Sequence, residues 1–253
     1  MLEYSRLVNE AENAINWIKE YVNKTGAKGV VVGNSGGKDS ATVIAMATNA
    51  LGKENVLTVA MPCNSIKEDL EDAQLVSKKF EVELITVDLT ESYNNLENTI
   101  NNVLNGLELN KESKINIKPR MRMTTLYAIA QSKGYLVIGT GNLCERMVGY
   151  TTKWGDSASD FNPIANFTVD EVLEIGKYLG VPEKIINKSP SDGLGGQTDE
   201  EKMGVSYKQI AEFIETGKTN PDAMNIIEKR NRESKHKRDA VPVYEFDRKN
   251  YLK

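Results

Sequence analysis

Cysteine, histidine and long apolar runs are scarce in this sequence. Its two cysteines, Cys63 and Cys144, lie too far apart to form a CxxC pair or a metal-ligand spacing, and there is one histidine, His236. The sequence therefore predicts no disulfide framework, no zinc centre and no Ser-His-Asp or Cys-His nucleophile. No apolar run approaches the ~20 residues that a membrane-spanning helix needs.

The overall charge is small and negative. The formal net charge is -4 at pH 7, so we expect no general attraction to nucleic acid or to an anionic membrane. Residues 1–22 combine acids with a helical apolar period, which predicts a folded helix rather than a signal peptide. Together with the low cysteine content, this favours a cytoplasmic location.

Short β-branched runs alternate with amphipathic stretches in the first half of the chain. Strands are expected at 28–32, 56–60, 82–87 and 135–139, and helices near 38–50, 66–80 and 91–105. A further helix is expected to begin near Pro119. This alternation is typical of parallel strands joined by right-handed crossovers. The expected fold class is therefore α/β, a doubly wound parallel sheet flanked by helices.

The last part of the chain, from about residue 165, is expected to be helical. Thr168 and Glu171 form a capping box that opens one helix. Residues 187–203 begin with many turn formers, which fits either a disordered loop or an active-site lid that orders on ligand binding. No segment has the composition of a linker between domains, so residues 1–253 are expected to form one domain.

The segment from Gly33 to Ser40 carries the strongest local signal. It reads GNSGGKDS and lies between an expected strand and an expected helix. Such a turn presents backbone N–H groups and the positive end of a helix dipole, which suits phosphate. A Walker A loop needs Ser or Thr after Gly-Lys, whereas Asp39 follows Lys38 here. The motif instead resembles the pyrophosphate loop of the ATP pyrophosphatases.

Two carboxylates are candidate catalytic residues that hold magnesium. Asp39 lies inside the glycine-rich loop, where a cation is the most suitable neighbour, although an acid in a first helical turn also suits the helix dipole. Glu145 lies just beyond the segment 139–142, at the end of another expected strand. Ligands bind beyond the carboxyl ends of such strands. We therefore expect both loops to face one cleft, with Mg²⁺ between Asp39 and Glu145.

Three further segments carry charges that either bind a ligand or are simply solvated. Pro119 suits the first position of a helix, which would put Arg120 and Arg122 in its first turn, where a cation opposes the dipole. Segment 149–160 follows no helix or strand period, so a binding loop is favoured. The basic run 229–238 by itself fits the solvated end of a helix, and no interleaved aromatic residue supports nucleic-acid binding.

Taken in order, these segments resemble the ammonia-dependent NAD synthetase family over nearly the whole chain. The glycine loop is shared by all ATP pyrophosphatases, whereas the ordered set is specific to this family. The matching segments are Ser35-Gly36-Gly37-Lys38-Asp39-Ser40, Asn116-x-x-x-Arg120-x-Arg122-Met123, Gly139-Thr140-Gly141-Asn142-x-x-Glu145, Gly149-Tyr150-x-Thr152-Lys153-x-Gly155-Asp156, Asp160, Pro190-Ser191-x-x-Leu194, Gln197-x-Asp199-Glu200 and His236-Lys237-Arg238.

The resemblance implies ATP-dependent amidation of nicotinic acid adenine dinucleotide (deamido-NAD) with ammonia, through an acyl-adenylate, to give NAD, AMP and pyrophosphate. It assigns Asp39 and Glu145 to Mg²⁺. It assigns these residues to ATP: Gly33, Asn34, Ser35, Gly36, Gly37, Lys38, Asp39, Ser40, Thr140 and Ser191. It assigns these residues to deamido-NAD: Arg120, Lys153, Asp160, His236 and Lys237.

The resemblance also implies a homodimer, for which the expected helices near 91–105 and 119–131 would supply the surface. Two positions depart from the family pattern. Val169 stands where many relatives have a lysine that helps to bind ATP, which puts that one contact in doubt. Ser191 stands where threonine is common, and it keeps the hydroxyl.

Two other functions are compatible with the glycine loop. One is another adenylating enzyme, such as a GMP synthetase core or a tRNA-thiolating enzyme, but thiolation requires a persulfide-carrying cysteine or a zinc-binding CxxC pair. The other is a regulatory module that binds ATP without turnover, which has little use for two carboxylates at a strand-end cleft. The chain is also short for an added glutaminase domain, so the expected nitrogen donor is free ammonia, with a separate glutaminase as its possible source.

Overall fold

The computed structural model describes residues 2–104, 106–188 and 198–247. Within them, one sheet is built from strands that all pair in parallel. The strands are β1 (Val30–Gly33), β2 (Val56–Ala60), β3 (Glu83–Thr86) and β4 (Leu136–Ile138), in the order β3-β2-β1-β4. The expected α/β fold with a parallel sheet is confirmed, and each strand overlaps its expected range.

The order of the strands reverses beside β1. From β1 the chain adds β2 and then β3 on one side, and it later returns to add β4 on the other side. Val31 of β1 therefore lies between Leu57 of β2 and Val137 of β4. Open parallel sheets bind ligands at such a reversal, beyond the carboxyl ends of the strands. The loops that follow β1 and β4 are thus placed to form a site.

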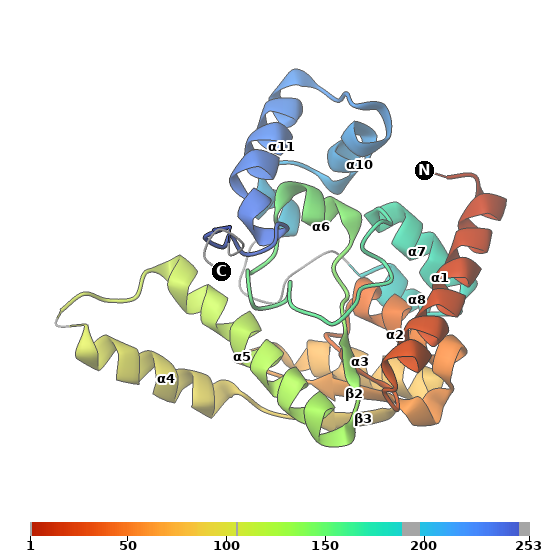
Figure 1. Cartoon of the computed structure of the whole chain (residues 1–253), viewed down its shortest axis with the longest axis horizontal. Coiled ribbons are helices and arrows are strands. Elements are labelled where there is room, and N and C mark those ends of the chain that lie inside the picture. Colours follow the sequence, from red (N-terminus) through yellow and green to blue (C-terminus); the bar gives the residue numbers. More distant parts are fainter. Residues whose placement is uncertain (1, 105, 189–197, 248–253) are drawn as a thin grey trace.

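Helices cover both faces of the sheet (Figure 1). Successive side chains of a strand point to opposite faces, so Val30 and Val32 enter one core and Val31 enters another. The first core includes residues of α1 (Tyr4–Thr25), α2 (Lys38–Leu51), α3 (Lys67–Phe80), α7 (Val169–Tyr178) and α8 (Glu183–Ile186). The second includes residues of α4 (Thr90–Val103) and α5 (Lys111–Lys133).

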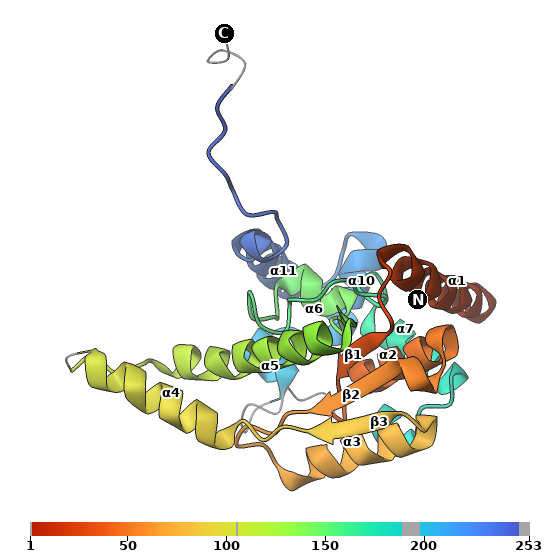
Figure 2. The same cartoon turned by 60° about the horizontal axis from the view of Figure 1, so that its bottom comes forward.

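A third and smaller core lies among helices alone. It joins the start of α7 to α6 (Leu143–Val148), α9 (Asp199–Met203), α10 (Tyr207–Thr216) and α11 (Pro221–Glu233). Short 3-10 helices occupy η1 (Lys53–Asn55) and η2 (Lys235–Lys237). After η2, the described residues 239–247 extend away from the helices (Figure 2). None of the helices in the described ranges combines the length and apolar character that crossing a membrane requires.

The helix that was expected to begin near Pro119 begins instead at Lys111. Asn110 caps it, because its side chain accepts a hydrogen bond from the Ser113 N–H at 2.8 Å. Pro119 lies inside α5, where it has no N–H to donate to the preceding turn. The expectation that Arg120 and Arg122 oppose the dipole of a first turn was therefore wrong. Both lie in the middle of α5, where the dipole has little effect.

Candidate functional site

The phosphate loop, residues 33–40, connects the end of β1 to the first turn of α2. Gly37 is the N-cap of α2, and no described side chain caps this helix end. The N–H groups of a first helical turn have no partners within the helix, so they and the positive end of the dipole are available to an anion. Ser35 Oγ accepts a hydrogen bond from the Gly37 N–H at 3.2 Å and lies 3.1 Å from Ser40 Oγ.

The loop also packs tightly against α3. The buried Asn34 amide donates to Ala73 O at 2.9 Å and to Ser77 Oγ at 3.0 Å, and Asn34 Oδ1 accepts from the Gly36 N–H at 3.1 Å. Gly36 has a φ of +73°, and a Cβ at this position would lie 2.6 Å from Asp69 O. Both the backbone conformation and the neighbouring helix therefore require glycine here.

A cleft of about 730 Å³ opens beyond the ends of β1 and β4. This volume is typical of sites for small molecules. Its walls include every residue of the phosphate loop except Gly36, together with Gly139, Thr140 and Gly141 after β4. The expectation that the two strand-end loops face one cleft is confirmed.

Asp39 and Glu145 line this cleft from the two different loops. Glu145 is fixed by a capping box at the start of α6: Asn142 Oδ1 accepts from the Glu145 N–H and Glu145 Oε2 accepts from the Asn142 N–H, both at 3.0 Å. Lys38 Nζ lies 3.9 Å from Asp39 Oδ2. The other oxygen, Asp39 Oδ1, is buried and has no hydrogen-bond partner among the described residues.

The environment of these two carboxyl groups disfavours their negative charge. Burial in the cleft raises the pKa of Asp39, an effect that the Lys38 ammonium partly opposes. Burial also raises the pKa of Glu145 well above its usual range, and the neighbouring Asp39 carboxylate raises it further. Without a cation, the fold therefore makes ionisation of each group less favourable than it is in water. A cation between them would favour the ionised forms instead.

These residues suit Mg²⁺. This ion prefers oxygen ligands and usually takes one or two carboxylates, completing its shell with phosphate oxygens of the substrate and with water. Asp39 Oδ1 lacks another partner, and the phosphate loop lies beside it. Across the described part of the chain, no group of three or more His, Cys, Asp or Glu residues is arranged to hold a metal. A cation here would therefore depend on oxygens of a bound phosphate ligand.

A tyrosine and carboxylate network beside the acid pair had been given no role from the sequence. Asp199 accepts hydrogen bonds from Tyr150 Oη at 3.1 Å and from Tyr207 Oη at 3.3 Å, and all three residues line the cleft. Lys38 Nζ lies 5.8 Å from the centre of the Tyr207 ring. Burial, followed by the charges of Glu145 and Asp199, raises the pKa of Tyr207, so its hydroxyl remains a donor. No local pattern signals that α10 reaches the phosphate loop.

Arg120 and Lys153, which the resemblance assigns to the dinucleotide, lie together but do not line the cleft. Arg120 Nε donates to Lys153 O at 3.2 Å, and Lys153 Nζ lies 5.5 Å from the centre of the Trp154 ring. Arg120 and Trp154 are exposed. Arg122, by contrast, lines the cleft and donates to Met61 O at 3.1 Å. Of the two arginines, Arg122 is thus the one that faces the cleft.

Asp160 already uses its carboxylate to hold the edge of β4. Asp160 Oδ2 accepts from the Val137 N–H at 2.7 Å, and Oδ1 accepts from Tyr127 Oη at 3.4 Å. The residue is exposed and lies outside the lining of the cleft. A dinucleotide would reach Asp160 only along the surface beyond the cleft.

The two candidates in the basic run have different surroundings. Lys237 lines the cleft, and its Nζ donates to Gly149 O at 2.8 Å and to Thr151 O at 2.6 Å. Burial lowers the pKa of Lys237. His236 is exposed and does not line the cleft. Lys237 therefore holds the 149–151 segment in place.

The remaining positions considered for ATP binding are Thr140, Val169 and Ser191, and the structure describes only the first two. Thr140 lines the cleft beside the phosphate loop. Val169, at the start of α7, is 5% exposed and packs in the third core, so its side chain is directed into the protein. Ser191 and the rest of 189–197 lie outside the described residues, so the choice between a loop and a lid for 187–203 stays open there; the described part of that segment includes α9, which begins at Asp199.

Neither cysteine is placed for nucleophilic chemistry. Both are buried free thiols that do not line the cleft. Burial raises the pKa of Cys144 to about 12 and also raises that of Cys63. A reactive cysteine needs a lowered pKa. The structure therefore gives no support to the sulfur-transfer alternative.

Comparisons with known proteins agree on one family. The family model described as NAD synthase matches residues 10–249. A curated NH(3)-dependent NAD(+) synthetase from Carboxydothermus hydrogenoformans is 44% identical over 235 residues, which is 92% of this chain and 96% of that protein.

Solved structures extend the likeness to the fold. The NMN synthetase from Francisella tularensis has a TM-score of 0.89 and 33% identity, covering 95% of this chain and 99% of its own. The NH3-dependent NAD synthetase from Campylobacter jejuni has a TM-score of 0.79 and 28% identity, covering 97% of this chain and 100% of its own.

Proposed function

Because this chain belongs to the NAD synthase family, we propose that the cleft beyond β1 and β4 is its active site. The reaction is the conversion of deamido-NAD to NAD with ammonia and ATP. One observation supports assigning the active site to this cleft. The phosphate loop and the carboxyl groups of Asp39 and Glu145 line a single cleft where the strand order reverses.

An acyl-adenylate route needs only the kinds of group that this cleft contains. The carboxylate of deamido-NAD attacks the α phosphate of ATP, and pyrophosphate leaves. Ammonia then attacks the acyl carbon and loses a proton as AMP leaves. Neither step requires a protein nucleophile. The contributions of the protein are positioning and the stabilisation of charge.

Residues in the loops after β1 and β4 provide this positioning and charge stabilisation. The N–H groups at the start of α2, together with Lys38, bind the phosphates of ATP. Asp39 and Glu145 hold Mg²⁺, which when bound neutralises phosphate charge and stabilises the leaving pyrophosphate. The protonated Tyr207 hydroxyl orients Asp199 beside them.

Several further expectations remain part of this proposal. Ammonia itself is the nitrogen donor, because the relatives described above are NH3-dependent. A separate glutaminase is one candidate source of that ammonia, and the cytoplasm is the expected location. Residues 1–253 are expected to act as one domain.

A homodimer is expected through the arm formed by α4 and α5. The two helices lie side by side and project from the sheet in both views (Figure 1, Figure 2). Val103 and Leu107, near the tip of the arm, are each 68% exposed. Burying such side chains against a second copy removes apolar surface from water.

An assay with ATP, Mg²⁺, ammonium and deamido-NAD tests the proposed function. NAD and pyrophosphate are measured together. We expect equal amounts of both over many turnovers with all four components, and without ammonium at most one equivalent of pyrophosphate per active site and no NAD. Pyrophosphate release without NAD would instead indicate a different adenylating enzyme. ATP binding without either product would indicate a regulatory module and contradict the proposal.

A second candidate product is NMN, made by amidation of the corresponding acid mononucleotide. The observation that favours it is the similarity to the solved NMN synthetase. Comparing kcat/KM for the acid mononucleotide and for deamido-NAD decides between the two. We expect deamido-NAD to be the better substrate, and the opposite order would assign the chain to NMN formation.

Lys237→Ala and His236→Ala are each expected to raise the KM for deamido-NAD. Lys237 lines the cleft, and the loss of one hydrogen bond to a charged group, about 1.5 kcal/mol, corresponds to about a tenfold rise in KM. His236 is exposed, so its effect should be smaller. The KM for ATP should change less in both variants.

Lys235→Ala is the matched control, because Lys235 lies in the same 3-10 helix but forms an ion pair with Asp239 on the surface. Its kinetic constants should equal those of the parent protein. If the His236 and Lys237 variants also bind deamido-NAD like the parent, η2 lies outside the substrate site.

A further inference from the structure

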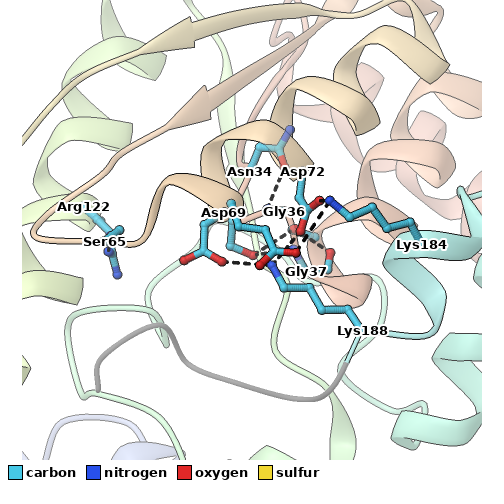
Figure 3. A network of polar contacts seen from close by, with 12 residues as sticks. Asn34, Gly36, Gly37, Ser65, Asp69, Asp72, Arg122, Lys184 and Lys188 are labelled. Carbon is cyan, nitrogen blue, oxygen red and sulfur yellow. Dashed lines mark hydrogen bonds and ion pairs between the residues drawn. The ribbon is translucent and has the colours of Figure 1, made fainter. Parts of the chain in front are cut away.

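Four charged side chains beside the phosphate loop form a network to which the proposed function gives no role (Figure 3). They are Asp69 and Asp72 on α3, Lys184 on α8, and Lys188 in the turn after α8. The Asp72 side chain is fully buried, and its two oxygens lie 2.6 Å from Lys184 Nζ and 2.7 Å from Lys188 Nζ. Lys188 Nζ also lies 2.9 Å from Asp69 Oδ1. Lys188 thus joins two successive turns of α3.

This network touches the phosphate loop directly. A Cβ added to Gly36 would lie 2.6 Å from Asp69 O and 2.7 Å from Asp72 Cβ. The two residues that bind Lys188 are therefore the same two against which Gly36 packs. Asn34 makes a second link, because it bonds both to α3 and to the Gly36 N–H. A shift at the start of α3 would consequently move the loop.

Lys188 is better placed than Lys184 to control this contact. Its side chain is 24% exposed and lines the cleft, and it bonds to both aspartates. Lys184 is 52% exposed and forms ion pairs with Asp72 and, at 3.7 Å, with Glu68, but none with Asp69 among the described contacts. Water and salt weaken exposed ion pairs more than buried ones. The stronger connection to α3 is therefore the one that Lys188 makes.

The turn that carries Lys188 is anchored in the first core. Ile185 and Ile186 are buried there together with residues of α2 and α7. Burial by itself lowers the pKa of Lys188, but its hydrogen bonds to Asp72 and Asp69 outweigh this and raise the pKa overall. Lys188 thus remains a cation that connects a firmly packed turn to the start of α3.

We propose that Lys188 is a positioning residue for ATP: through Asp72 and Asp69 it fixes the start of α3 against Gly36 and so sets the shape of the phosphate loop. This inference rests on the proposed function, because it takes the loop to bind the phosphates of ATP. Lys188 acts on the nucleotide through α3 and makes no contact with the reacting atoms.

Lys188→Met tests the inference, since it removes the charge while Asp72 keeps Lys184. We expect the KM for ATP and the Kd for ATP measured by calorimetry to rise about tenfold, because small displacements of binding groups are costly. The KM for deamido-NAD should change by less than about twofold, and the melting temperature should change little. Lys188→Arg keeps the charge and should recover most of the ATP affinity.

Lys177→Met is the control, because Lys177 forms an ion pair with Glu174 on the surface of α7. It should behave like the parent protein. An unchanged ATP affinity in Lys188→Met would overturn the inference. So would an equal rise in both KM values, which indicates general damage to the structure. If the parent protein itself makes no NAD, the proposed function fails separately.

A double variant separates positioning from direct contact with phosphate. If Lys188 acts through Asp72, then Lys188→Met should change the Kd for ATP little when Asp72→Asn is already present, because coupled residues are not additive. An undiminished effect in that background would show direct contact and overturn the inference. If Asp72→Asn does not fold, Asp69→Asn takes its place as the background. The effect of Lys188→Met on the Kd for ATP should then be smaller than in the parent protein, and an unchanged effect would overturn the inference.

Discussion

Asp39→Asn is expected to lower kcat for NAD formation by about 10²–10³, the usual effect of removing one group that stabilises charge in a transition state. The asparagine keeps the shape of the side chain but provides no negative charge for Mg²⁺. Asp39 Oδ1 has no hydrogen-bond partner among the described residues, and asparagine retains the size of the side chain beside Lys38. The variant should therefore fold normally and require more Mg²⁺ for half-maximal activity.

Asp170→Asn provides the matched control for this variant. Asp170 also lies in the first turn of a helix, α7, but it is exposed and outside the cleft. Its turnover and magnesium dependence should equal those of the parent protein. Normal turnover of Asp39→Asn at saturating Mg²⁺ would remove Asp39 from the metal site.

Glu145→Gln should lower turnover by a similar factor of about 10²–10³, while making the metal-free protein more stable near neutral pH. Gln can replace Glu in a capping box, so the start of α6 should be retained. The variant lacks the carboxyl group whose ionisation the fold disfavours. Melting curves without Mg²⁺ should therefore show a higher melting temperature than for the parent protein at pH 7.

The pH dependence follows from the direction of the pKa shift. The pKa of Glu145 lies well above its usual range in the folded protein because of burial and the nearby Asp39 carboxylate. In the unfolded chain, a glutamate has a pKa of about 4.3. Between these two values the folded state binds more protons, so the stability of the parent protein falls as pH rises. The gain in melting temperature of Glu145→Gln should thus disappear at pH values below about 4.3, the pKa of glutamate in the unfolded chain. It should also become smaller when Mg²⁺ is added.

Glu171→Gln is the control for this second variant. Glu171 occupies the same position of a capping box, at the start of α7, and does not line the cleft. Its turnover should be normal, and its melting temperature should lack the gain near neutral pH. If Glu145→Gln is no more stable than the parent protein at pH 7, the fold does not disfavour the ionised form of Glu145.

The sequence by itself determined the parallel sheet and the loop that follows β1. β-Branched runs separated by helical segments leave few arrangements open, and the glycines around Asp39 can be read from their spacing alone. The capping box at Thr168 likewise depends on two residues three positions apart. These are local features, and local physics specifies them.

Only the tertiary structure decided which charged residues enter the cleft. Arg120 and Arg122 are two positions apart on α5, yet Arg122 lines the cleft while Arg120 is exposed. A local rule for Pro119 had placed both in a first helical turn. The cap at Asn110 and the packing of α5 against the sheet outweighed the preference of proline for the start of a helix.

The same holds for contacts between distant parts of the chain. Tyr207 reaches the acid pair from α10, and Lys188 reaches Gly36 through α3, although neither position carries a local signal. Such contacts depend on how complete helices pack against one another. The sequence therefore determined the strands, the phosphate loop with Asp39, and the segment after β4 that carries Glu145, because these follow from neighbouring residues. The tertiary structure decided which lysines, arginines and tyrosines surround them, because burial and the partners of a charge exist only after the helices have packed.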